Sequence, residues 1–272
     1  MYPMYIKKII KYINYFPYYL EIFAKRLNGR GLMNPKTNGE YKVLENLIKK
    51  KSFDQFTMID GGSNIGDHLI KTVYFCQKYN LSNQNLFAVE VNTDLHEKLK
   101  INLKNIKFSL ISDALSSNKG FATLYYDSDD LYSGQSSIYY AYYHNATKKI
   151  KTTTLDNIIE SNNINFVDFV KLDIEGGEYN ALIGAERSLS KGKINYIQLE
   201  YTQNWIEGGG SIKKVLDLIG KYNYSLFLIR KKDLLSIKKY NFHLDDFFYS
   251  NLLIVKNGCP YPLKIKRDLI PI

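Results

Sequence analysis

The stretch Met58-Ile59-Asp60-Gly61-Gly62-Ser63-Asn64-Ile65-Gly66 decides the fold of this 272-residue chain. An apolar run that begins at Phe56 leads into the glycines and predicts a strand. The apolar residues that follow have the spacing of a helix that buries one face: Leu69, Ile70, Val73 and Cys76. A strand, a glycine-rich turn and a helix, in that order, bring the backbone close to a nucleotide at the carboxyl end of a sheet. Glycine allows this approach because it has no Cβ.

The spacing of these glycines is G-G-x-x-x-G, which differs from the G-x-G-x-x-G of dinucleotide-binding proteins. Asp60 ends the strand where a pyrophosphate would otherwise lie, and its carboxylate would repel that group. A positively charged ligand, such as an amino acid that carries a sulfonium group, is compatible with Asp60. The motif therefore indicates a nucleotide-type site that does not suit a dinucleotide.

Length and composition are those of one large domain with a complete core. Apolar residues make up 45% of the chain, and no uninterrupted apolar run approaches the roughly 18 residues of a membrane span. The first residues lack the apolar segment and the small-residue cleavage site of a signal peptide. Cys76 and Cys259 form neither a disulfide framework nor a metal-ligand spacing. We therefore assign no metal ligands, leave metal dependence open, and expect a cytoplasmic, reducing location.

The chain is basic, with 37 Lys and Arg against 27 Asp and Glu and a net charge of +10. Many basic residues are adjacent: Lys7-Lys8, Lys49-Lys50-Lys51, Lys148-Lys149, Arg230-Lys231-Lys232 and Lys238-Lys239. Dispersed positive charge keeps a protein soluble and also attracts anionic partners. Anionic glycans, lipid-linked sugars and nucleotide sugars are among the partners that such a surface suits.

Residues 1–50 are predicted to form a helical extension. A stripe of isoleucines opens it, with lysines on the other faces: Ile6, Ile9, Ile10 and Ile13, and Lys7, Lys8 and Lys11. We expect Pro17 to interrupt this helix. The helix either docks on the main domain or makes a peripheral contact with the inner face of a membrane through residues 1–16. A turn cluster at 34–39 and a short helix from Glu40 to Ile48 then lead into the first strand.

Strand and helix patterns alternate along the rest of the chain. The expected strands are Phe56–Asp60, Leu86–Glu90, Ile106–Ile111, 120–126, Phe166–Asp173, Ile194–Glu200, Tyr224–Ile229 and Leu252–Val255. The expected helices are Gly66–Tyr79, Asp94–Leu103, Leu155–Ile159, Tyr179–Leu189 and Ile212–Lys221. This order predicts an α/β fold, with a doubly wound, mostly parallel sheet and an antiparallel strand permitted at its edge. The predicted division is an extension (1–50), a main domain (51–258) and a tail (259–272).

Ligands bind such sheets beyond the carboxyl ends of the strands. The second strand delivers Glu90 there, near the offset of about 20 residues from the glycines that suits an acid accepting hydrogen bonds from a ribose. Asp113 follows the third strand and would either accept a hydrogen bond from an adenine amino group or cap its own loop. Both residues are therefore candidates for nucleoside binding.

The segment Asp173-Ile174-Glu175-Gly176-Gly177-Glu178 follows the fourth strand and contains three acids. One acid would suffice to cap the next helix, so the others indicate function. Glu200 ends the fifth strand, and aligned strand ends would place the acids along one rim: Asp60, Glu90, Asp173, Glu175 and Glu200. Crowded carboxylates raise at least one pKa, which favours a general base or a bound cation.

These residues resemble the FkbM-type S-adenosylmethionine-dependent methyltransferases. The resemblance is carried by Ile59–Gly66, Phe87–Glu90, Thr154-Leu155-Asp156, Phe169–Glu178 with Leu182, Gly184 and Ala185 after it, and Ile197–Glu200. The block Phe169–Glu178 is the most specific, whereas most class I methyltransferases share the glycine motif. The likeness covers roughly residues 38–256, and Ser63 replaces the usual alanine.

The resemblance implies a class I methyltransferase (Rossmann-like) fold, with a seven-stranded sheet whose last strand is antiparallel. It also implies methyl transfer from S-adenosylmethionine to a hydroxyl of a sugar, glycan or small natural product. By position, it assigns Glu90 to the ribose, Asp113 to the adenine, and a set around the turn to the methionine part of the cofactor: Asp60, Gly61, Gly62, Ser63, Asn64 and Gly66.

The family pattern does not identify a catalytic base. We assign Asp173, with Glu175 or Glu200 assisting, from strand-end position alone. The alternatives are His68, which also suits an ordinary helix surface, His144 and His243. We expect the acceptor site to lie between Asp127–His144 and the segment with Trp205 and Gly208-Gly209-Gly210, although Trp205 suits a purely structural role equally well.

Three other functions are compatible with such a sheet. A nucleic-acid methyltransferase would explain the charge, but the basic residues are dispersed and no Asn-Pro-Pro-Tyr-like site follows the fourth strand. A NAD-dependent oxidoreductase would share the architecture, but the glycine spacing and Asp60 disfavour it. A non-catalytic scaffold would not need the full set of acids. We therefore expect an enzyme with a small-molecule or glycan acceptor and no nucleic-acid partner.

Overall fold

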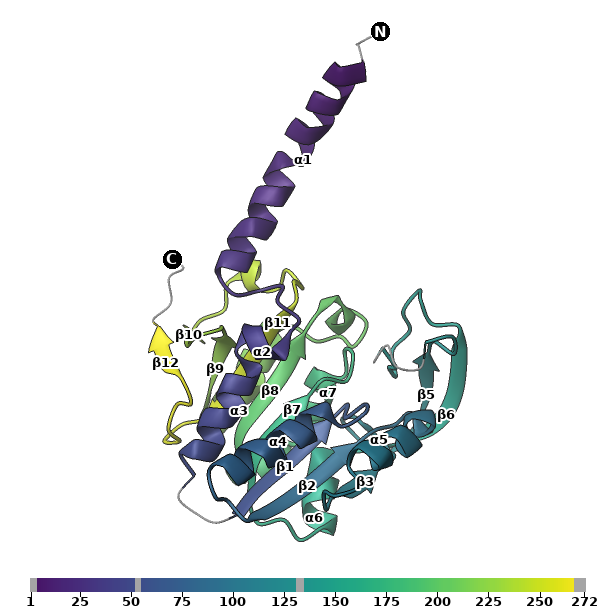
Figure 1. The fold of residues 1–272 in the computed structure, drawn as a ribbon, viewed down its shortest axis with the longest axis vertical. Helices are drawn as coiled ribbons and strands as arrows, with labels where there is room; N and C mark the ends of the chain where they lie inside the picture. Colours follow the sequence, from purple (N-terminus) through teal and green to yellow (C-terminus); the bar gives the residue numbers. More distant parts are fainter. Residues whose placement is uncertain (1–3, 52–54, 131–134, 267–272) are drawn as a thin grey trace.

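The computed structural model describes residues 4–51, 55–130 and 135–266, with side chains from residue 15 onward in these ranges. A nine-stranded sheet forms the centre of the described chain, and helices cover both of its faces (Figure 1). In spatial order its strands are β12 (Lys264–Lys266), β10 (Asp233–Ile237), β9 (Tyr224–Ile229), β11 (Ser250–Lys256), β8 (Ile194–Tyr201), β7 (Val167–Leu172), β1 (Gln55–Gly61), β2 (Asn83–Val89) and β3 (Ser109–Ile111). The five strands from β8 to β3 are parallel, which confirms the predicted α/β fold.

The other half of the sheet corrects two predictions. β11 is antiparallel to both β8 and β9, so the antiparallel strand lies inside the sheet and not at its edge. β10 and β12 then extend the sheet, so the described strands exceed the seven that were expected. β10 was not predicted. The charged run Arg230-Lys231-Lys232 directly before it forms a tight hairpin turn, in which the N–H of Arg230 donates to the carbonyl oxygen of Asp233 at 3.0 Å.

Helices pack on the two faces of the sheet as two separate layers. One layer contains α3 (Glu40–Lys49), α4 (Asp67–Lys78) and α5 (His96–Asn102). The other contains α6 (Leu155–Ser161), α7 (Glu178–Ile183), α8 (Glu186–Ser190) and α9 (Ile212–Ile219). Strand residues alternate between the layers, as in β1, where Met58 packs in the first and Ile59 in the second. Core packing crosses both predicted domain boundaries, because α3 is buried against the sheet and β12 pairs with it.

A second, three-stranded sheet lies beside β3 and contains β4 (Ala114–Leu115), β6 (Ala146–Thr153) and β5 (Gly120–Tyr126) in the order β4-β6-β5. The predicted extended segment 120–126 is β5. β6 was not predicted because its lysines obscure the alternation: Ala146-Thr147-Lys148-Lys149-Ile150-Lys151-Thr152-Thr153. The only member of this strand that packs in an apolar cluster is Ile150.

The first helix, α1 (Met4–Leu27), stands away from the sheet domain (Figure 1). It continues through Pro17, so the expected interruption there was wrong. Proline has a helical φ, but it removes an N–H donor and crowds the preceding turn, so the helix continues through Pro17 at a local cost. The turn cluster at 34–39 contains a short helix, α2 (Pro35–Asn38), capped by the side chain of Asn34. Among the described helices, none combines the length and hydropathy needed to cross a bilayer.

Asp156, from the Thr154-Leu155-Asp156 motif, is a structural residue that we predict to stabilise α8. Its buried carboxylate accepts hydrogen bonds from the N–H groups of Arg187 (3.0 Å) and Ser188 (2.8 Å). Asp156→Ala leaves both amides without their acceptor, so urea denaturation should show a loss of about 2–3 kcal/mol in unfolding free energy. The exposed Asp217→Ala should change it by less than about 0.5 kcal/mol. Equal losses in the two variants would contradict this role.

Candidate active site

The glycine turn fits between the ends of β7 and β2. Gly62 has a φ of +77°, and a Cβ built on it would lie 1.8 Å from the carbonyl oxygen of Asp173. The N–H of Asp173 donates to the carbonyl oxygen of Gly61 at 3.0 Å, and the N–H of Gly62 donates to that of Val89 at 2.9 Å. Only glycine allows β7 to approach the turn this closely.

A cavity of about 300 Å³ lies beside this turn, at the carboxyl ends of β1, β2, β7 and β8. We call it the Glu90 cavity. Its lining includes Gly62, Asn64, Glu90, Val91, Leu95, Leu115, Ile138, Asp173, Glu175, Gly177 and Glu200. Apolar residues and convergent polar groups thus share its wall, and such a combination is found in small-molecule sites. Four of the five acids predicted along the rim line this cavity, and the fifth, Asp60, lines the next cavity.

Glu90 is held rigidly at the wall of this cavity. Its two oxygens accept hydrogen bonds from the N–H groups of Asn64 and Asn92, each at 2.8 Å. Burial raises the pKa of Glu90 to about 7, although these hydrogen bonds oppose the rise. Each carboxylate oxygen retains a second lone pair. Glu90 can therefore accept hydrogen bonds from two vicinal hydroxyls, as a ribose presents them.

A second cavity, of about 370 Å³, lies on the side of α3 and α4, and we call it the Asp60 cavity. It shares Gly62, Asn64, Asp173 and Glu200 with the Glu90 cavity. Its own lining includes Met33, Glu40, Tyr41, Asp60, Ser63, His68, Lys171 and Tyr249. The two cavities thus meet at the glycine turn and at the ends of β7 and β8.

Three carboxylates gather at this meeting point. Oxygens of Asp173, Glu175 and Glu200 lie within 4.8 Å of one another, a spacing that suits either a shared proton or one cation. Lys171 donates to Asp173 at 2.7 Å. Burial would raise the pKa of Asp173, but Lys171 and a hydrogen bond with Glu200 hold it below its usual value. Burial and repulsion by its two neighbours raise the pKa of Glu200 well above its usual value.

Glu175 adopts an uncommon backbone conformation that its neighbours maintain. Its φ is +54°, in the left-handed region that non-glycine residues rarely occupy. The carboxylate of Glu178 accepts from the N–H groups of Ile174 (2.8 Å) and Gly176 (3.0 Å), and the side chain of Asn204 donates to that of Glu175 at 2.5 Å. Glu178 is therefore the acid that folding explains. Burial and the nearby Asp173 raise the pKa of Glu175 to about 7.

Residues 60–226 match the family described as the methyltransferase FkbM domain. The chain belongs to this family. FkbM methyltransferases use S-adenosylmethionine as methyl donor, which confirms the expected family and cofactor. A comparison with curated proteins finds no match.

Solved structures with a similar chain path include three methyltransferases. An FkbM methyltransferase from Methylobacillus flagellatus KT is 17% identical, with a TM-score of 0.48 and coverage of 79% of this chain and 47% of that one. This chain thus spans about half the length of that protein. A precorrin-6y C5,15-methyltransferase from Geobacter metallireducens is 14% identical (TM-score 0.39; 79% and 88% covered). A SAM-dependent methyltransferase from Agrobacterium tumefaciens is 9% identical (TM-score 0.43; 80% and 61% covered).

The residues around the turn fit the FkbM family's cofactor. Asp60 is 1% exposed, and neither of its carboxylate oxygens has a hydrogen-bond partner among the described residues. Burial raises the pKa of Asp60 to about 6, although the positive charge of the nearby Lys171 acts to lower it. An unpartnered buried carboxylate is costly, and a cationic ligand would supply the missing partner. The methionine part of S-adenosylmethionine carries such a cation, while Glu90 and the apolar wall suit its nucleoside.

Other predicted residues occupy several different environments. Gly61 and Gly66 lie in the turn, and Ser63 lines the Asp60 cavity, where its hydroxyl donates to the carbonyl oxygen of Asp60 at 2.7 Å. Asp113 does not line the Glu90 cavity, although the next residue, Ala114, does. The predicted contact between Asp113 and an adenine stays a prediction.

The three histidines considered as alternative bases lie in different environments. His68 is buried beside Tyr41 in the Asp60 cavity, not on a helix surface, and its Nε2 has no described partner. Burial lowers its pKa well below the usual value, so its ring is neutral. His144 accepts from the N–H of Ala141 within its own loop, and His243 lies in an exposed turn. Neither of these two lines the Glu90 cavity or the Asp60 cavity.

The expected walls of the acceptor site are only partly described. Within Asp127–His144, Ser136, Ser137 and Ile138 line the Glu90 cavity, while 131–134 lie outside the described residues. Trp205 is fully buried, and its indole N–H donates to the carbonyl oxygen of Glu200 at 2.8 Å. Trp205 therefore fixes the end of β8. A Cβ on Gly208 would lie 1.9 Å from the carbonyl oxygen of Gly176, which explains a glycine there by close packing.

Lys171 is the residue that sequence reasoning missed. It is 6% exposed, and although burial alone would lower its pKa, the surrounding Asp173, Asp60 and Glu40 raise it. Glu40 is also buried, and the side chain of Gln198 donates to it at 2.6 Å. The buried strand Val167–Leu172 contains two charged residues, Asp168 and Lys171, and the lysine was a visible signal of a buried cation.

The pKa of Glu90 makes cofactor binding depend on pH. Each oxygen of Glu90 already accepts a hydrogen bond from a backbone N–H. A proton on the carboxyl group would disrupt one of these hydrogen bonds and make Glu90 a weaker hydrogen-bond acceptor for the ribose. We expect the affinity for S-adenosylmethionine, measured by calorimetry, to fall about tenfold between about pH 8 and about pH 6, as Glu90 gains its proton. Glu90→Gln should bind more weakly and lose most of this dependence. An unchanged pH profile in that variant would assign the effect to another group.

Proposed function

We propose that this protein transfers a methyl group from S-adenosylmethionine to a hydroxyl of a sugar, a glycan or a small natural product. The observation that carries the proposal is the cluster of Asp173, Glu175 and Glu200 where the two cavities meet. A hydroxyl must lose its proton as it becomes an ether oxygen, and a carboxylate placed at the reacting oxygen can accept that proton.

The donor supplies an electrophilic methyl group when it is bound. The task of the protein is then to hold the donor and to align an acceptor oxygen with it, and alignment alone can contribute much of the acceleration. Glu90 suits the ribose hydroxyls and Asp60 the cationic end, as the hydrogen bonds and the unpartnered oxygens described above indicate.

We assign the role of base to Asp173, with Glu175 and Glu200 assisting. Lys171 keeps Asp173 ionised, so its carboxylate is available as a hydrogen-bond acceptor. The side chain of Asp173 is 33% exposed, and Asp173 lines both cavities. Glu175, with a pKa of about 7, is matched to neutral pH and can receive the proton.

The charge balance at the site favours an acceptor that is uncharged where it reacts. The two cavities are lined by several carboxylates and, among the described lining residues, by one basic side chain, that of Lys171. A phosphate or carboxylate next to the acceptor hydroxyl would be repelled. Anionic parts of a larger acceptor would instead contact the basic outer surface. The same balance disfavours a nucleic-acid backbone inside the site.

Asp173→Asn tests the assignment of the base. The amide cannot accept a proton, so methyl transfer should fall by about 100-fold or more. S-adenosylmethionine should still bind in calorimetry, because Glu90 and Asp60 are unchanged. Asp217→Asn, at an exposed helix position, is the matched control and should retain full turnover. Retained turnover in the Asp173 variant would rule out Asp173 as the base.

The acceptor class can be tested with radiolabelled S-adenosylmethionine. The purified chain is incubated with glycans, small metabolites and nucleic acids fractionated from cells. We expect label in an alkali-stable methyl ether on a sugar or small-molecule fraction. Label confined to nucleic acid or to protein would overturn the proposed acceptor, while the family membership would stand.

A further inference from the structure

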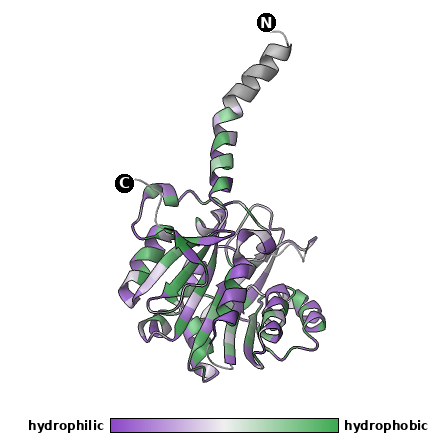
Figure 2. Cartoon of the chain, turned by 60° about the vertical axis from the view of Figure 1, so that its left-hand side comes forward, coloured by the Kyte–Doolittle hydropathy of each residue, from purple (hydrophilic) through white to green (hydrophobic). Residues whose placement is uncertain are grey.

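Helix α1 carries an apolar stripe that the rest of the described chain leaves uncovered. Five large side chains follow the spacing i, i+3, i+4, i+7 and i+11 and therefore share one face of the helix: Phe16, Tyr19, Leu20, Phe23 and Leu27. Their exposed fractions run from 54% at Leu20 to 71% at Leu27. Figure 2 shows hydrophobic bands, in green, along the described part of α1, which extends away from the domain. A continuous exposed apolar face of this kind indicates a binding surface.

The opposite side of α1 is tied to the domain. Lys25 pairs with Glu21 at 2.6 Å and with Asp246 at 3.1 Å. Arg30, just beyond the helix, donates to Asp246 at 2.8 Å and to the hydroxyl of Ser250 at 2.7 Å. These contacts fix the base of α1 against the segment that leads into β11. The apolar stripe is left on the free side.

The sequence before this part of α1 continues the same pattern. In the sequence, Tyr5, Ile9 and Tyr12 precede Phe16 at intervals of four, three and four, which is the spacing of the stripe. No Asp or Glu occurs before Glu21, whereas three lysines do: Lys7, Lys8 and Lys11. This stripe differs from the isoleucine stripe expected for residues 1–16, whose side chains lie outside the described residues up to residue 14.

We propose that α1 docks this protein on an anionic membrane surface, with the stripe from Phe16 to Leu27 in the boundary between headgroups and acyl chains. Aromatic and leucine side chains suit such a boundary, and the lysines that precede the stripe in the sequence complement anionic headgroups. A second copy of this helix would instead bring lysines against lysines. Since no described helix can cross a bilayer, α1 would lie on the surface.

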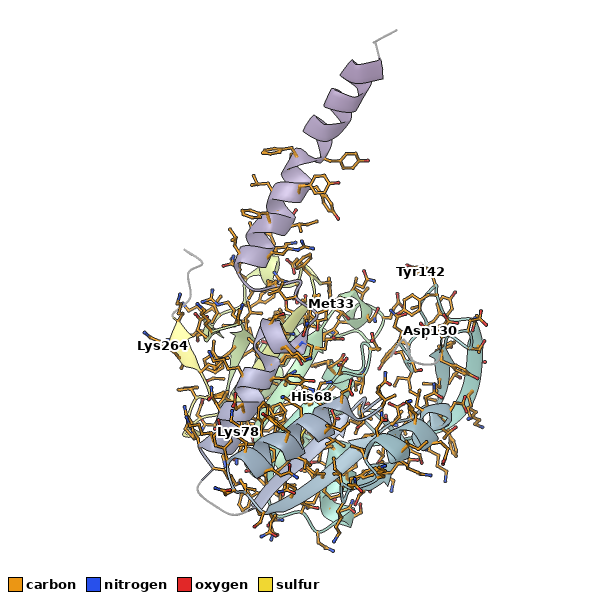
Figure 3. The ribbon with its side chains drawn as sticks, viewed as in Figure 1. Met33, His68, Lys78, Asp130, Tyr142 and Lys264 are labelled. Atoms are coloured by element: carbon orange, nitrogen blue, oxygen red, sulfur yellow. The ribbon has the colours of Figure 1, made fainter. Side chains whose placement is uncertain are left out.

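The docked helix would lie next to the opening of the active site. Met33, which is 74% exposed, lines the Asp60 cavity and follows α1 closely in the chain. Figure 3 shows Met33 at the base of α1, above His68, another residue of the same cavity. A membrane that covers the stripe is therefore adjacent to the cavity mouth.

The test is cosedimentation of the full chain with vesicles. The probes are vesicles of equal parts phosphatidylcholine and phosphatidylglycerol, and vesicles of phosphatidylcholine alone. We expect binding to the anionic vesicles and a loss of it in F16S/F23S/L27S. The control I101S/F121S/F166S removes three apolar residues of similar exposure on other elements and should bind as the unmodified chain does. K7Q/K8Q/K11Q keeps the stripe and should lower the partition by about two orders of magnitude.

Calorimetry with S-adenosylmethionine should give the same affinity for every variant, which confirms that the sheet domain is folded and separates docking from catalysis. Equal vesicle binding by F16S/F23S/L27S and its control would overturn the proposal. So would a failure of the unmodified chain to bind anionic vesicles. A dimer in light scattering that F16S/F23S/L27S converts to a monomer, without vesicle binding, would show that a second copy covers the stripe.

Discussion

The buried ammonium of Lys171 is the interaction on which the active site depends. It lies among Asp173, Asp60 and Glu40, and among the described residues that line the two cavities it is the one basic side chain. Without it, several carboxylates would be buried near one another with no cation, an arrangement that is strongly destabilising. With it, the pKa of Asp173 lies below its usual value, while burial and the repulsion of its neighbours raise the pKa of Glu200. Lys171 thus sets Asp173 apart from the acids around it.

The backbone imposes a second constraint on the same region. β1 and β7 approach so closely that no side chain fits at Gly62, and the loop after β8 approaches Gly176 just as closely at Gly208. These contacts bring Glu90, Glu175 and Glu200 to one cavity although they come from three strand ends. The acids are precisely the groups that would repel one another, so tight backbone packing is needed to keep them together.

The sequence alone predicted much of this arrangement, because parallel strands place their carboxyl ends at one edge and the acids there stand out. Glu90, Asp173, Glu175 and Glu200 were found in this way. Lys171 was not assigned, since a strand pattern does not say whether a polar residue faces a cavity or solvent. β6 was missed because its lysines weaken the alternation, and β10 is a short strand that directly follows a charged turn. At Pro17 an interruption was predicted where the helix continues, because local propensity does not set the length of a helix.

The unpartnered oxygens of Asp60 have a consequence for turnover. The unpaired carboxylate attracts the charged donor more strongly than the uncharged thioether that remains after methyl transfer, because the thioether has lost the sulfonium charge. This loss of attraction therefore favours release of the thioether once transfer is complete. Spent cofactor would compete poorly with fresh donor, and the site would resist product inhibition without any moving part.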